Sequence, residues 1–350
     1  MKAHPLLPPE RGESGGLPTS AEQSAETYRS RYRGALLGGA IGDALGRPAE
    51  GRRPEKVRQR HGTLTDFKPW RGWKSGPKGT ITDDTQMSMC VAETLVAHGW
   101  LDPQDLARRF VDWLAVGRGK GRTCTTAVMR LTEGVPWHEA GQPSAGNGAA
   151  MRAAPVGLLH ACDFDELRRD AALSAVVTHA DPMAVASAIC QAYATAWLLH
   201  VPTGELDPVD LIEALAGALA DVHDPGHPER KPDADDRLVP LRERIAEIPG
   251  LLGNSAEDAF AYLYNGAFVL ESLPAAIWCF LSSPEDPECV LVTAANGGYD
   301  ADTVAAMAGN LAGAYCGEDA FPDRWLEDLE FASELRDLAD SLFDRIGLVP

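Results

Sequence analysis

Apolar residues recur at helical spacing along nearly the whole chain, whereas the apolar and polar alternation that would indicate strands is almost absent. This pattern predicts an all-α fold, a single compact multi-helix bundle. Of the 350 residues, 45% are apolar, which is enough to fill the core of such a bundle. The expected helices cover residues 28–46, 83–99, 103–116, 121–133, 148–160, 165–178, 181–200, 208–222, 236–247, 256–263, 265–282, 285–295, 301–316 and 323–346.

Two of these helices carry glycine at every fourth position on one face. Glycine inside a helix costs about 1 kcal/mol relative to alanine, so a stripe of this kind indicates that another backbone approaches closely. We therefore expect both helices at the centre of the bundle. The stripes are Gly34, Gly38, Gly42 and Gly46 in the first helix, and Gly309, Gly313 and Gly317 near the C-terminus.

Residues 1–27 are rich in Pro, Gly, Ser and Glu and contain no apolar run of the kind found in secretion signals. We expect a disordered tail over residues 1–27, one domain over residues 28–350 and a cytoplasmic protein. The net charge of −19 argues against nucleic acid or a membrane as a partner. The apolar stretch from Val185 to Val201 is too short to span a bilayer with certainty, so we interpret it as a core helix.

Two acidic clusters stand at the heads of expected helices made largely of small and apolar residues: Thr82-Asp83-Asp84-Thr85 and Asp300-Ala301-Asp302-Thr303. Either cluster could simply cap its helix, but capping needs one such residue. Each further carboxylate adds repulsion that a cation or a proton must offset. Hard cations select carboxylate and hydroxyl oxygens, so the pair of clusters predicts a two-metal site.

Three long segments are expected to be loops: residues 51–79, 136–146 and 222–235. The first two flank the acidic clusters or the segment between them, and we expect them to form walls of the site. We interpret the third as an exposed insertion.

Five blocks of sequence resemble one family, the ADP-ribosylglycohydrolases, which include dinitrogenase reductase-activating glycohydrolase. The resemblance implies an all-α enzyme with two Mg²⁺ (or Mn²⁺) ions that removes ADP-ribose from a modified acceptor. The blocks are RGALLGGAIGDALG (33–46), TDDT (82–85), GNGAAMR (146–152), THADP (178–182) and DADT (300–303). The metal ligands that it implies are Thr82, Asp83, Asp84, Asp300, Asp302 and Thr303.

The resemblance also assigns catalytic roles. We expect Glu50, Asp84 and Asp302 to be the catalytic carboxylates, because a carboxylate near the anomeric carbon, or able to protonate the leaving group, assists glycoside cleavage. Without the resemblance, Glu50 would be taken for an ordinary exposed loop acid. Asp43, inside the glycine-faced helix, is interpreted as a hydrogen-bonded structural acid, with a place behind the metal ligands as the alternative.

Substrate contacts are expected from Asn147 and Gly148, whose loop enters a helix and could hold a diphosphate on free N–H groups. The alternative for that loop is a simple turn. His179 could contact the ADP group, or could equally be a capping or buried structural residue. Tyr299 stands where the family commonly has glycine, and its ring is expected to narrow the pocket or to stack on the substrate.

The predicted reaction is metal-dependent hydrolysis of ADP-ribosyl-arginine on a protein. Serine-linked ADP-ribose or a free ADP-ribose derivative comes next, and an inactive ADP-ribose-binding relative is the non-enzymatic alternative. A prenyl-diphosphate enzyme also uses Asp-rich helices with Mg²⁺. Its DDxxD motif is incomplete here, because Thr85-Gln86-Met87 follows Asp84.

Overall fold

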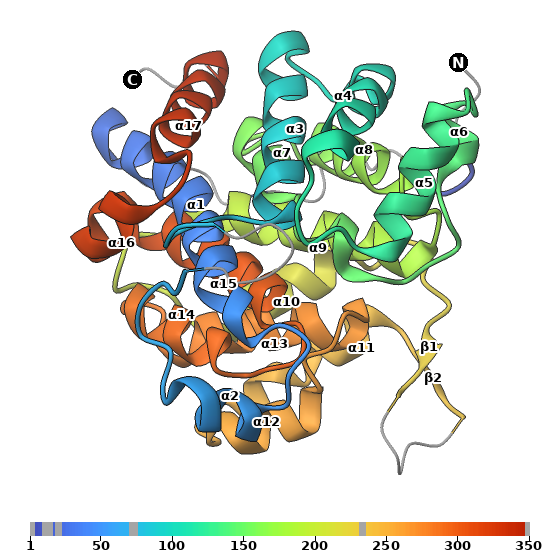
Figure 1. Cartoon of the computed structure of the whole chain (residues 1–350). Helices are drawn as coiled ribbons and strands as arrows, with labels where there is room; N and C mark the ends of the chain where they lie inside the picture. Colours follow the sequence, from blue (N-terminus) through green and yellow to red (C-terminus); the bar gives the residue numbers. More distant parts are fainter. Residues whose placement is uncertain (1–3, 9–16, 18–22, 70–75, 231–235, 347–350) are drawn as a thin grey trace.

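The computed structural model describes residues 4–8, 17, 23–69, 76–230 and 236–346, and within them the fold is a bundle of helices with one small β-hairpin (Figure 1). The all-α prediction is confirmed. The helices of the first half are α1 (Ala25–Gly46), α2 (Pro54–His61), α3 (Asp83–His98), α4 (Pro103–Val116), α5 (Arg122–Thr132), α6 (Trp137–Ala140), α7 (Ala154–Leu159) and α8 (Phe164–Val176). Those of the second half are α9 (Pro182–Leu199), α10 (Pro208–Ala218), α11 (Leu241–Ala246), α12 (Ala256–Leu263), α13 (Val269–Ser282), α14 (Pro287–Ala295), α15 (Ala301–Cys316), α16 (Asp323–Asp328) and α17 (Ala332–Ile346).

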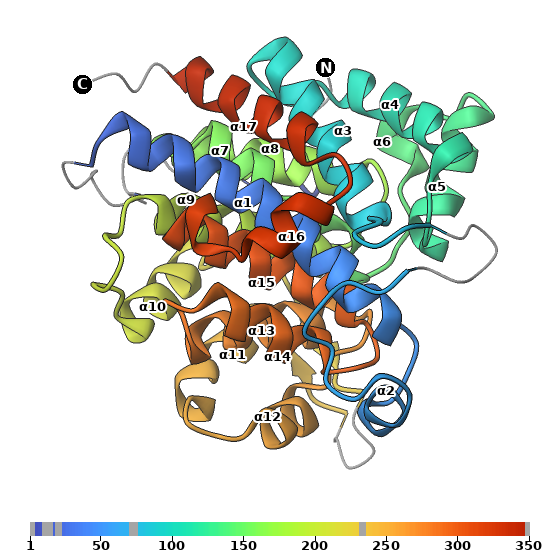
Figure 2. The same ribbon diagram turned by 60° about the vertical axis from the view of Figure 1, so that its left-hand side comes forward.

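The glycine stripes lie where α1 and α15 cross the middle of the bundle (Figure 2). A Cβ atom on Gly42 would lie 2.1 Å from the carbonyl oxygen of Ala305, and one on Gly313 would lie 1.9 Å from that of Gly34. The two backbones are therefore in direct contact, and the central position predicted for both helices is confirmed. Since the contacts run antiparallel, the C-terminal end of α1 meets the N-terminal end of α15, where Asp300 and Asp302 lie.

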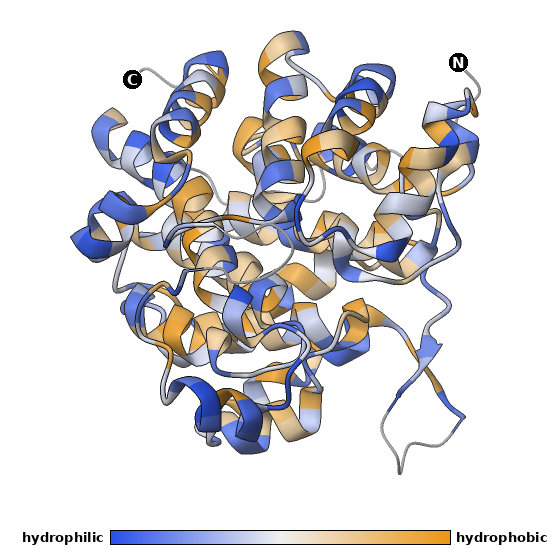
Figure 3. Ribbon diagram, viewed as in Figure 1, coloured by the Kyte–Doolittle hydropathy of each residue, from blue (hydrophilic) through white to orange (hydrophobic). Residues whose placement is uncertain are grey.

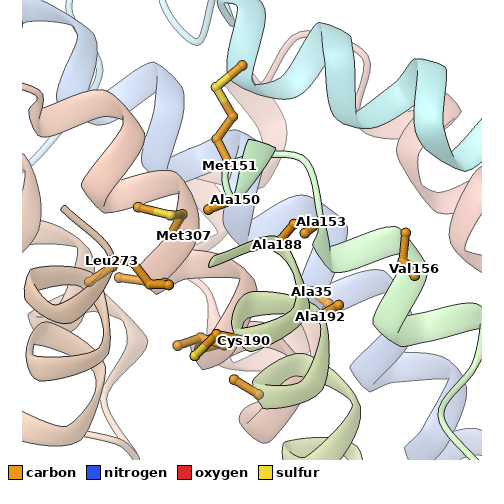
Figure 4. Close-up of a cluster of buried hydrophobic side chains, with 14 of the residues drawn as sticks. Ala35, Ala150, Met151, Ala153, Val156, Ala188, Cys190, Ala192, Leu273 and Met307 are labelled. Carbon is orange, nitrogen blue, oxygen red and sulfur yellow. The ribbon is translucent and has the colours of Figure 1, made fainter. Parts of the chain in front are cut away.

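Helix α9 is the apolar core helix of the bundle. In the described part of the chain it alone is long and apolar enough to cross a membrane, but 89% of it is buried within the protein. Small side chains allow its neighbours to pack closely, as the cluster around Ala188 and Ala192 shows (Figure 4). Helix α2 is almost entirely polar, and among its residues only Val57 is buried (Figure 3).

Several predicted helix boundaries are wrong. The helix expected over 148–160 is a short 3₁₀ turn, Asn147–Ala149, followed by α7, whose second residue is a proline and lacks a backbone donor. The helix expected over 323–346 is broken into α16 and α17. Phe331 has a φ of 61°, and the neighbouring Glu330 N–H donates instead to the Gly79 carbonyl, 3.0 Å away. The helix expected over 265–282 begins only at Val269.

The expected loops also contain structure. Helices α2 and α6 lie within segments 51–79 and 136–146, and residues 70–75 are outside the described part. Strands β1 (His227–Pro228) and β2 (Leu238–Val239) pair antiparallel where a loop and the start of a helix over 236–247 were expected. Of the expected tail, Leu6, Leu7 and Leu17 lie partly buried against the core, and α1 already begins at Ala25; most other tail residues lie outside the described part.

Candidate active site

One buried side chain of α1 holds the start of α3 in place. The carboxylate of Asp43 accepts hydrogen bonds from the backbone nitrogen and hydroxyl of Thr82, at 2.8 and 2.7 Å, and from those of Thr85, at 3.2 and 2.6 Å. These bonds occupy the free N–H groups at the start of α3, and Thr82 itself makes no capping bond. Asp43 is thus the hydrogen-bonded structural acid that the sequence predicted.

The α1–α15 contact and the Asp43 bonds together bring both acidic clusters to one cavity of about 350 Å³. Most of the predicted site residues line it. Thr82 does not, since it is fully buried behind the wall with its hydroxyl against Asp43 and Asp84. Tyr299 does not line it either. The predicted residues on the cavity wall are Glu50, Asp83, Asp84, Asn147, Gly148, His179, Asp300, Asp302 and Thr303.

Hydrogen-bond donors hold three of the carboxylates in place, two from neighbouring loops and one from within α15. Asp83 accepts the backbone N–H of Gly121, at 3.1 Å. Asp300 accepts the side-chain amide of Asn147, at 2.5 Å. Asp302 accepts the backbone N–H of Thr303, at 3.1 Å.

Burial in the cavity shifts the pKa of each of these aspartates upward in the protein alone. Burial, opposed in part by hydrogen bonds, raises the pKa of Asp83 to about 8 and that of Asp300 to about 6. Burial and then the charge of Asp43 raise the pKa of Asp84 well above its ordinary value. Burial and then the charge of Glu50 do the same to the pKa of Asp302. The cluster therefore lacks the positive charge that would stabilise its ionised form.

The donor set fits divalent cations. The buried Oδ1 atom of Asp84 has no hydrogen-bond partner, although an unpaired buried carboxylate oxygen is costly. The oxygens around it are carboxylates and the hydroxyl of Thr303, the donors that Mg²⁺ and Mn²⁺ prefer. The orphaned oxygen and the raised pKa values are both accounted for if cations complete the site.

The comparison with known families gives one assignment for almost the whole chain. The sequence model described as ADP-ribosylglycohydrolase matches residues 24–349. The chain belongs to the ADP-ribosylglycohydrolase family. The predicted resemblance is confirmed, and the protein is an enzyme that hydrolyses ADP-ribosyl glycosidic bonds.

Relatives and a solved structure agree with this assignment. Human ADP-ribosylhydrolase ARH3 is 32% identical over 75% of this chain and 77% of its own length. ADP-ribosylarginine hydrolase Tri1 of Pseudomonas putida is 29% identical over 76% of this chain and 67% of its own length. A solved ADP-ribosylglycohydrolase-related protein complex matches 92% of this chain and 99% of its own, with 30% identity and a TM-score of 0.67.

Glu50 lies at the edge of the glycohydrolase cavity, just after the 3₁₀ turn Arg47–Ala49. Its side chain is 33% exposed and is paired with the guanidinium of Arg47. The backbone N–H of Gly51 donates to the Tyr299 carbonyl, and that of Tyr299 donates to the Arg52 carbonyl, both at 2.6 Å. These two bonds fix the Glu50 loop against the start of α15.

The Asn147 loop is not the N-terminus of an α-helix that the sequence predicted. The Asn147 N–H donates to the Ala267 carbonyl, and the Gly146 N–H to the Ser144 hydroxyl, at 3.1 and 3.3 Å. The loop is therefore tightly held. A Cβ atom on Gly148 would lie 2.7 Å from the ring of His179, so only glycine lets the loop approach that ring.

His179 lines the cavity as a neutral ring. Burial, with Arg152 nearby, lowers its pKa to about 3. The guanidinium of Arg152 donates to the Thr178 hydroxyl, at 2.8 Å, and this hydroxyl lies 2.8 Å from Nδ1 of His179. A guanidinium can only donate, so the Thr178 hydroxyl keeps its own proton to give to Nδ1, and in that tautomer the ring proton is on Nε2.

Tyr299 lies in a neighbouring groove, and its ring packs on that of Tyr264 with centroids 5.3 Å apart. The groove encloses about 770 Å³ between α2, α12 and α14. Both tyrosines have positive φ angles, 54° for Tyr299 and 62° for Tyr264. The ring predicted to narrow the substrate pocket therefore lines the surface beside it.

Among the cavity residues that the sequence motifs did not indicate, two carry a positive charge, Arg122 and Arg230. Arg122 begins α5, and its position beside Asp83 could have been inferred from neither motif. Arg230 belongs to the segment that was interpreted as an exposed insertion, yet it lines the cavity. Two basic residues in an otherwise acidic site were the available signal, which becomes visible only when the fold brings the segments together.

A second group with metal-ligand spacing lies on α7 and α8, away from this cavity. Ligand atoms of His160, Glu166 and Asp170 lie within 4.8 Å of one another. Asp170 already accepts the ring of His160 at 2.7 Å and the Leu101 N–H at 2.7 Å, and Arg169 pairs with both acids. These contacts give the group a structural role in holding the loop before α4.

Proposed function

We propose that this ADP-ribosylglycohydrolase is a metal-dependent enzyme that releases ADP-ribose from ADP-ribosylated arginine on a protein. One observation carries the proposal: five carboxylates line a single cavity, and a buried oxygen of one of them, Asp84, has no partner. Two divalent cations, Mg²⁺ or alternatively Mn²⁺, would supply the missing positive charge.

Asp83, Asp84, Asp300, Asp302 and Thr303 would hold the ions. Thr82 could join them only through the free lone pairs of its hydroxyl oxygen, because its proton is directed to carboxylates. When bound, such ions orient ribose hydroxyls and lower the pKa of a bound water.

Glu50 would act at the glycosidic bond. It is partly exposed at the edge of the cavity, where its carboxylate can stabilise positive charge at the anomeric carbon or carry a proton at the leaving nitrogen. Asp84 and Asp302, which share the cavity, are the remaining candidates for taking a proton from water. In the tautomer with its proton on Nε2, the neutral His179 ring would offer the substrate a hydrogen-bond donor.

Two observations favour arginine as the acceptor. Glu50 offers a partly exposed carboxylate at the cavity edge, and Arg47 contacts it at Oε2, so the other oxygen can accept an N–H of an acceptor guanidinium. The relative Tri1 is named an ADP-ribosylarginine hydrolase. Serine-linked ADP-ribose and a free ADP-ribose derivative are the alternatives.

The test is a substrate panel. Purified enzyme is incubated with arginine-linked and serine-linked ADP-ribosylated proteins, with EDTA or with Mg²⁺, and released ADP-ribose is measured. We expect release from the arginine-linked protein only with Mg²⁺. Release in EDTA would contradict the metal dependence, and preference for the serine-linked protein would contradict the acceptor. Release from neither protein, with ADP-ribose still bound, would favour the inactive relative.

A further inference from the structure

The β1–β2 hairpin is firmly anchored at its base, beside the active site. The carboxylate of Asp224 accepts the N–H groups of Gly226 and Leu241, at 3.0 and 2.7 Å, and so closes the two arms. His227 lies 3.4 Å from a carboxylate oxygen of Asp181, at the start of α9. Glu229 forms an ion pair with the buried Arg244 of α11. The last described residue of the first arm, residue 230, is therefore held in a defined place.

That residue, Arg230, is exposed and is one of the residues that line the cavity. Its Cζ atom lies 4.2 Å from the centroid of the Phe268 ring, which is only 3% exposed and fixed in the core. On the wall formed by α5, Arg122 is the second cation of the cavity. Neither guanidinium forms an ion pair with any carboxylate in the described ranges, although the protein is strongly acidic.

An anionic ligand can bind in this acidic cavity only if positive groups offset its charge. ADP-ribose carries a diphosphate with two negative charges, and the cavity wall already contains five carboxylates. Two divalent cations would offset four of these charges and Arg47 pairs with the fifth carboxylate, Glu50, so no positive charge would remain for the diphosphate. The N–H groups of Gly146 and Asn147 are already bonded within the protein. The Asn147 loop thus offers the diphosphate fewer donors than the sequence suggested.

We infer that Arg230 and Arg122 bind the diphosphate of ADP-ribose, which makes the β1–β2 hairpin part of the substrate site. The inference rests on the proposed function. Guanidinium groups match phosphate oxygens with two parallel donors, and stacking on Phe268 restricts Arg230 before the ligand arrives. Less conformational freedom is then lost on binding.

The experiment compares Arg230→Gln, Arg122→Gln and Arg230→Lys with wild type in calorimetric titrations of the Mg²⁺-loaded protein with ADP-ribose. Each glutamine variant should weaken binding about tenfold or more, as expected for loss of a charge-assisted hydrogen bond. Arg230→Lys should lose less, because it retains the charge. The affinity of both Arg230 and Arg122 glutamine variants should also depend less steeply on salt. Arg237→Gln, farther along the same hairpin, is the matched control and should bind like wild type.

The thermal shift on adding Mg²⁺ is measured for every variant and should be unchanged, which separates diphosphate binding from damage to the fold or metal site. Tight binding by Arg230→Gln and Arg122→Gln, or equal losses in Arg237→Gln, would overturn the inference. If either result is found while wild type binds ADP-ribose and hydrolyses its substrate, the proposed function stands and only the role of the two arginines is excluded. Failure of wild type to bind or release ADP-ribose would instead overturn the proposed function.

Discussion

The carboxylate of Asp43 receives two hydrogen bonds from Thr85, one from its backbone nitrogen at 3.2 Å and one from its hydroxyl at 2.6 Å. A side chain in the last turn of the central helix α1 thereby caps a different helix, α3. Helix α1 therefore positions the ligand candidates Asp83 and Asp84. The same helix packs directly against α15 through the glycine contacts. One continuous set of contacts therefore sets the spacing of the two acidic clusters.

Asp43→Ala should lower the free energy of unfolding by at least about 2 kcal/mol, because buried N–H and hydroxyl donors at the start of α3 lose their acceptor. Asp43→Asn should lose less, since its oxygen can still accept. Urea denaturation of the metal-free variants measures both. An Asp43→Ala protein as stable as wild type would show that the cap contributes nothing to stability.

Because α1 and α15 touch through their glycines, the effect of a Gly→Ala substitution on stability should depend strongly on its position. Gly42→Ala would place a methyl group 2.1 Å from the Ala305 carbonyl oxygen, so the backbones must separate, and we expect a loss of about 2 kcal/mol or more. Gly217→Ala in α10 is the matched control, with no atom within 4 Å of the new Cβ, and should gain about 0.5–1 kcal/mol from helix propensity. Thermal melting distinguishes the two. Similar effects of both substitutions would contradict the close packing.

The sequence pattern predicted correctly those helices whose ends are determined by residues close in the sequence. Helix α15 occupies the predicted residues 301–316, and the glycine stripes placed it at the centre. The break between α16 and α17 could not be predicted this way, because the Glu330 N–H finds its acceptor in Gly79, far away in the sequence. The same holds for the 3₁₀ turn at Asn147, whose N–H is paired with the Ala267 carbonyl.

For the site, sequence motifs identified the carboxylates but not the groups brought to them by tertiary structure. Asp83 and Asp302 can be identified from the sequence because clustered acids at helix starts are costly without a counterion. Arg230 could not be selected from a polar segment that has no periodicity. The direction of the Tyr299 ring depends on its positive φ and on Tyr264, neither of which the motif contains.

Removing one negative ligand should disable the enzyme without unfolding it. We expect Asp83→Asn, Asp84→Asn, Asp300→Asn and Asp302→Asn each to lower kcat/KM by about 100-fold or more, the usual cost of disturbing a metal ligand or its supporting contact. Circular dichroism should show the folded spectrum in each. Near-normal turnover in two or more of the four would remove the two-metal proposal.

Metal choice follows from the same donors. EDTA should abolish activity and Mg²⁺ or Mn²⁺ should restore it, whereas Zn²⁺ should restore little, because the two acidic clusters offer carboxylate and hydroxyl oxygens. Activity is assayed after dialysis against EDTA and addition of each ion. Full recovery with Zn²⁺ alone would contradict this preference.

The pKa shifts predict how metal binding depends on pH. A carboxyl group whose pKa is raised by folding, such as Asp83 at about 8, favours the folded state at low pH and loses that contribution as pH rises through the raised pKa. The metal-free protein should therefore become less stable from pH 6 to pH 8. Since Mg²⁺ must displace these protons, its stabilising effect should grow over the same interval. Thermal melting with EDTA and with saturating Mg²⁺ tests the sign, and a larger shift at pH 6 would contradict it.

The last prediction concerns Tyr299, whose ring lies on Tyr264 in the groove beside the cavity. Tyr299→Gly should leave Mg²⁺ stabilisation and ADP-ribose affinity unchanged, because the ring is not on the cavity wall and glycine readily adopts the φ of 54°. Protein substrates extend beyond the cavity past Glu50, so their KM should rise, by up to about tenfold, the usual worth of an aromatic contact.

Tyr299→Phe separates the ring from its hydroxyl and should behave like wild type. Release of ADP-ribose from an ADP-ribosylated protein is compared with release from ADP-ribosyl-arginine alone, which is too small to reach the groove. A KM that rises equally for both substrates, or a weaker affinity for ADP-ribose, would place the ring in the substrate pocket after all. A change in melting temperature alone would limit Tyr299 to holding the Glu50 loop through its two backbone hydrogen bonds.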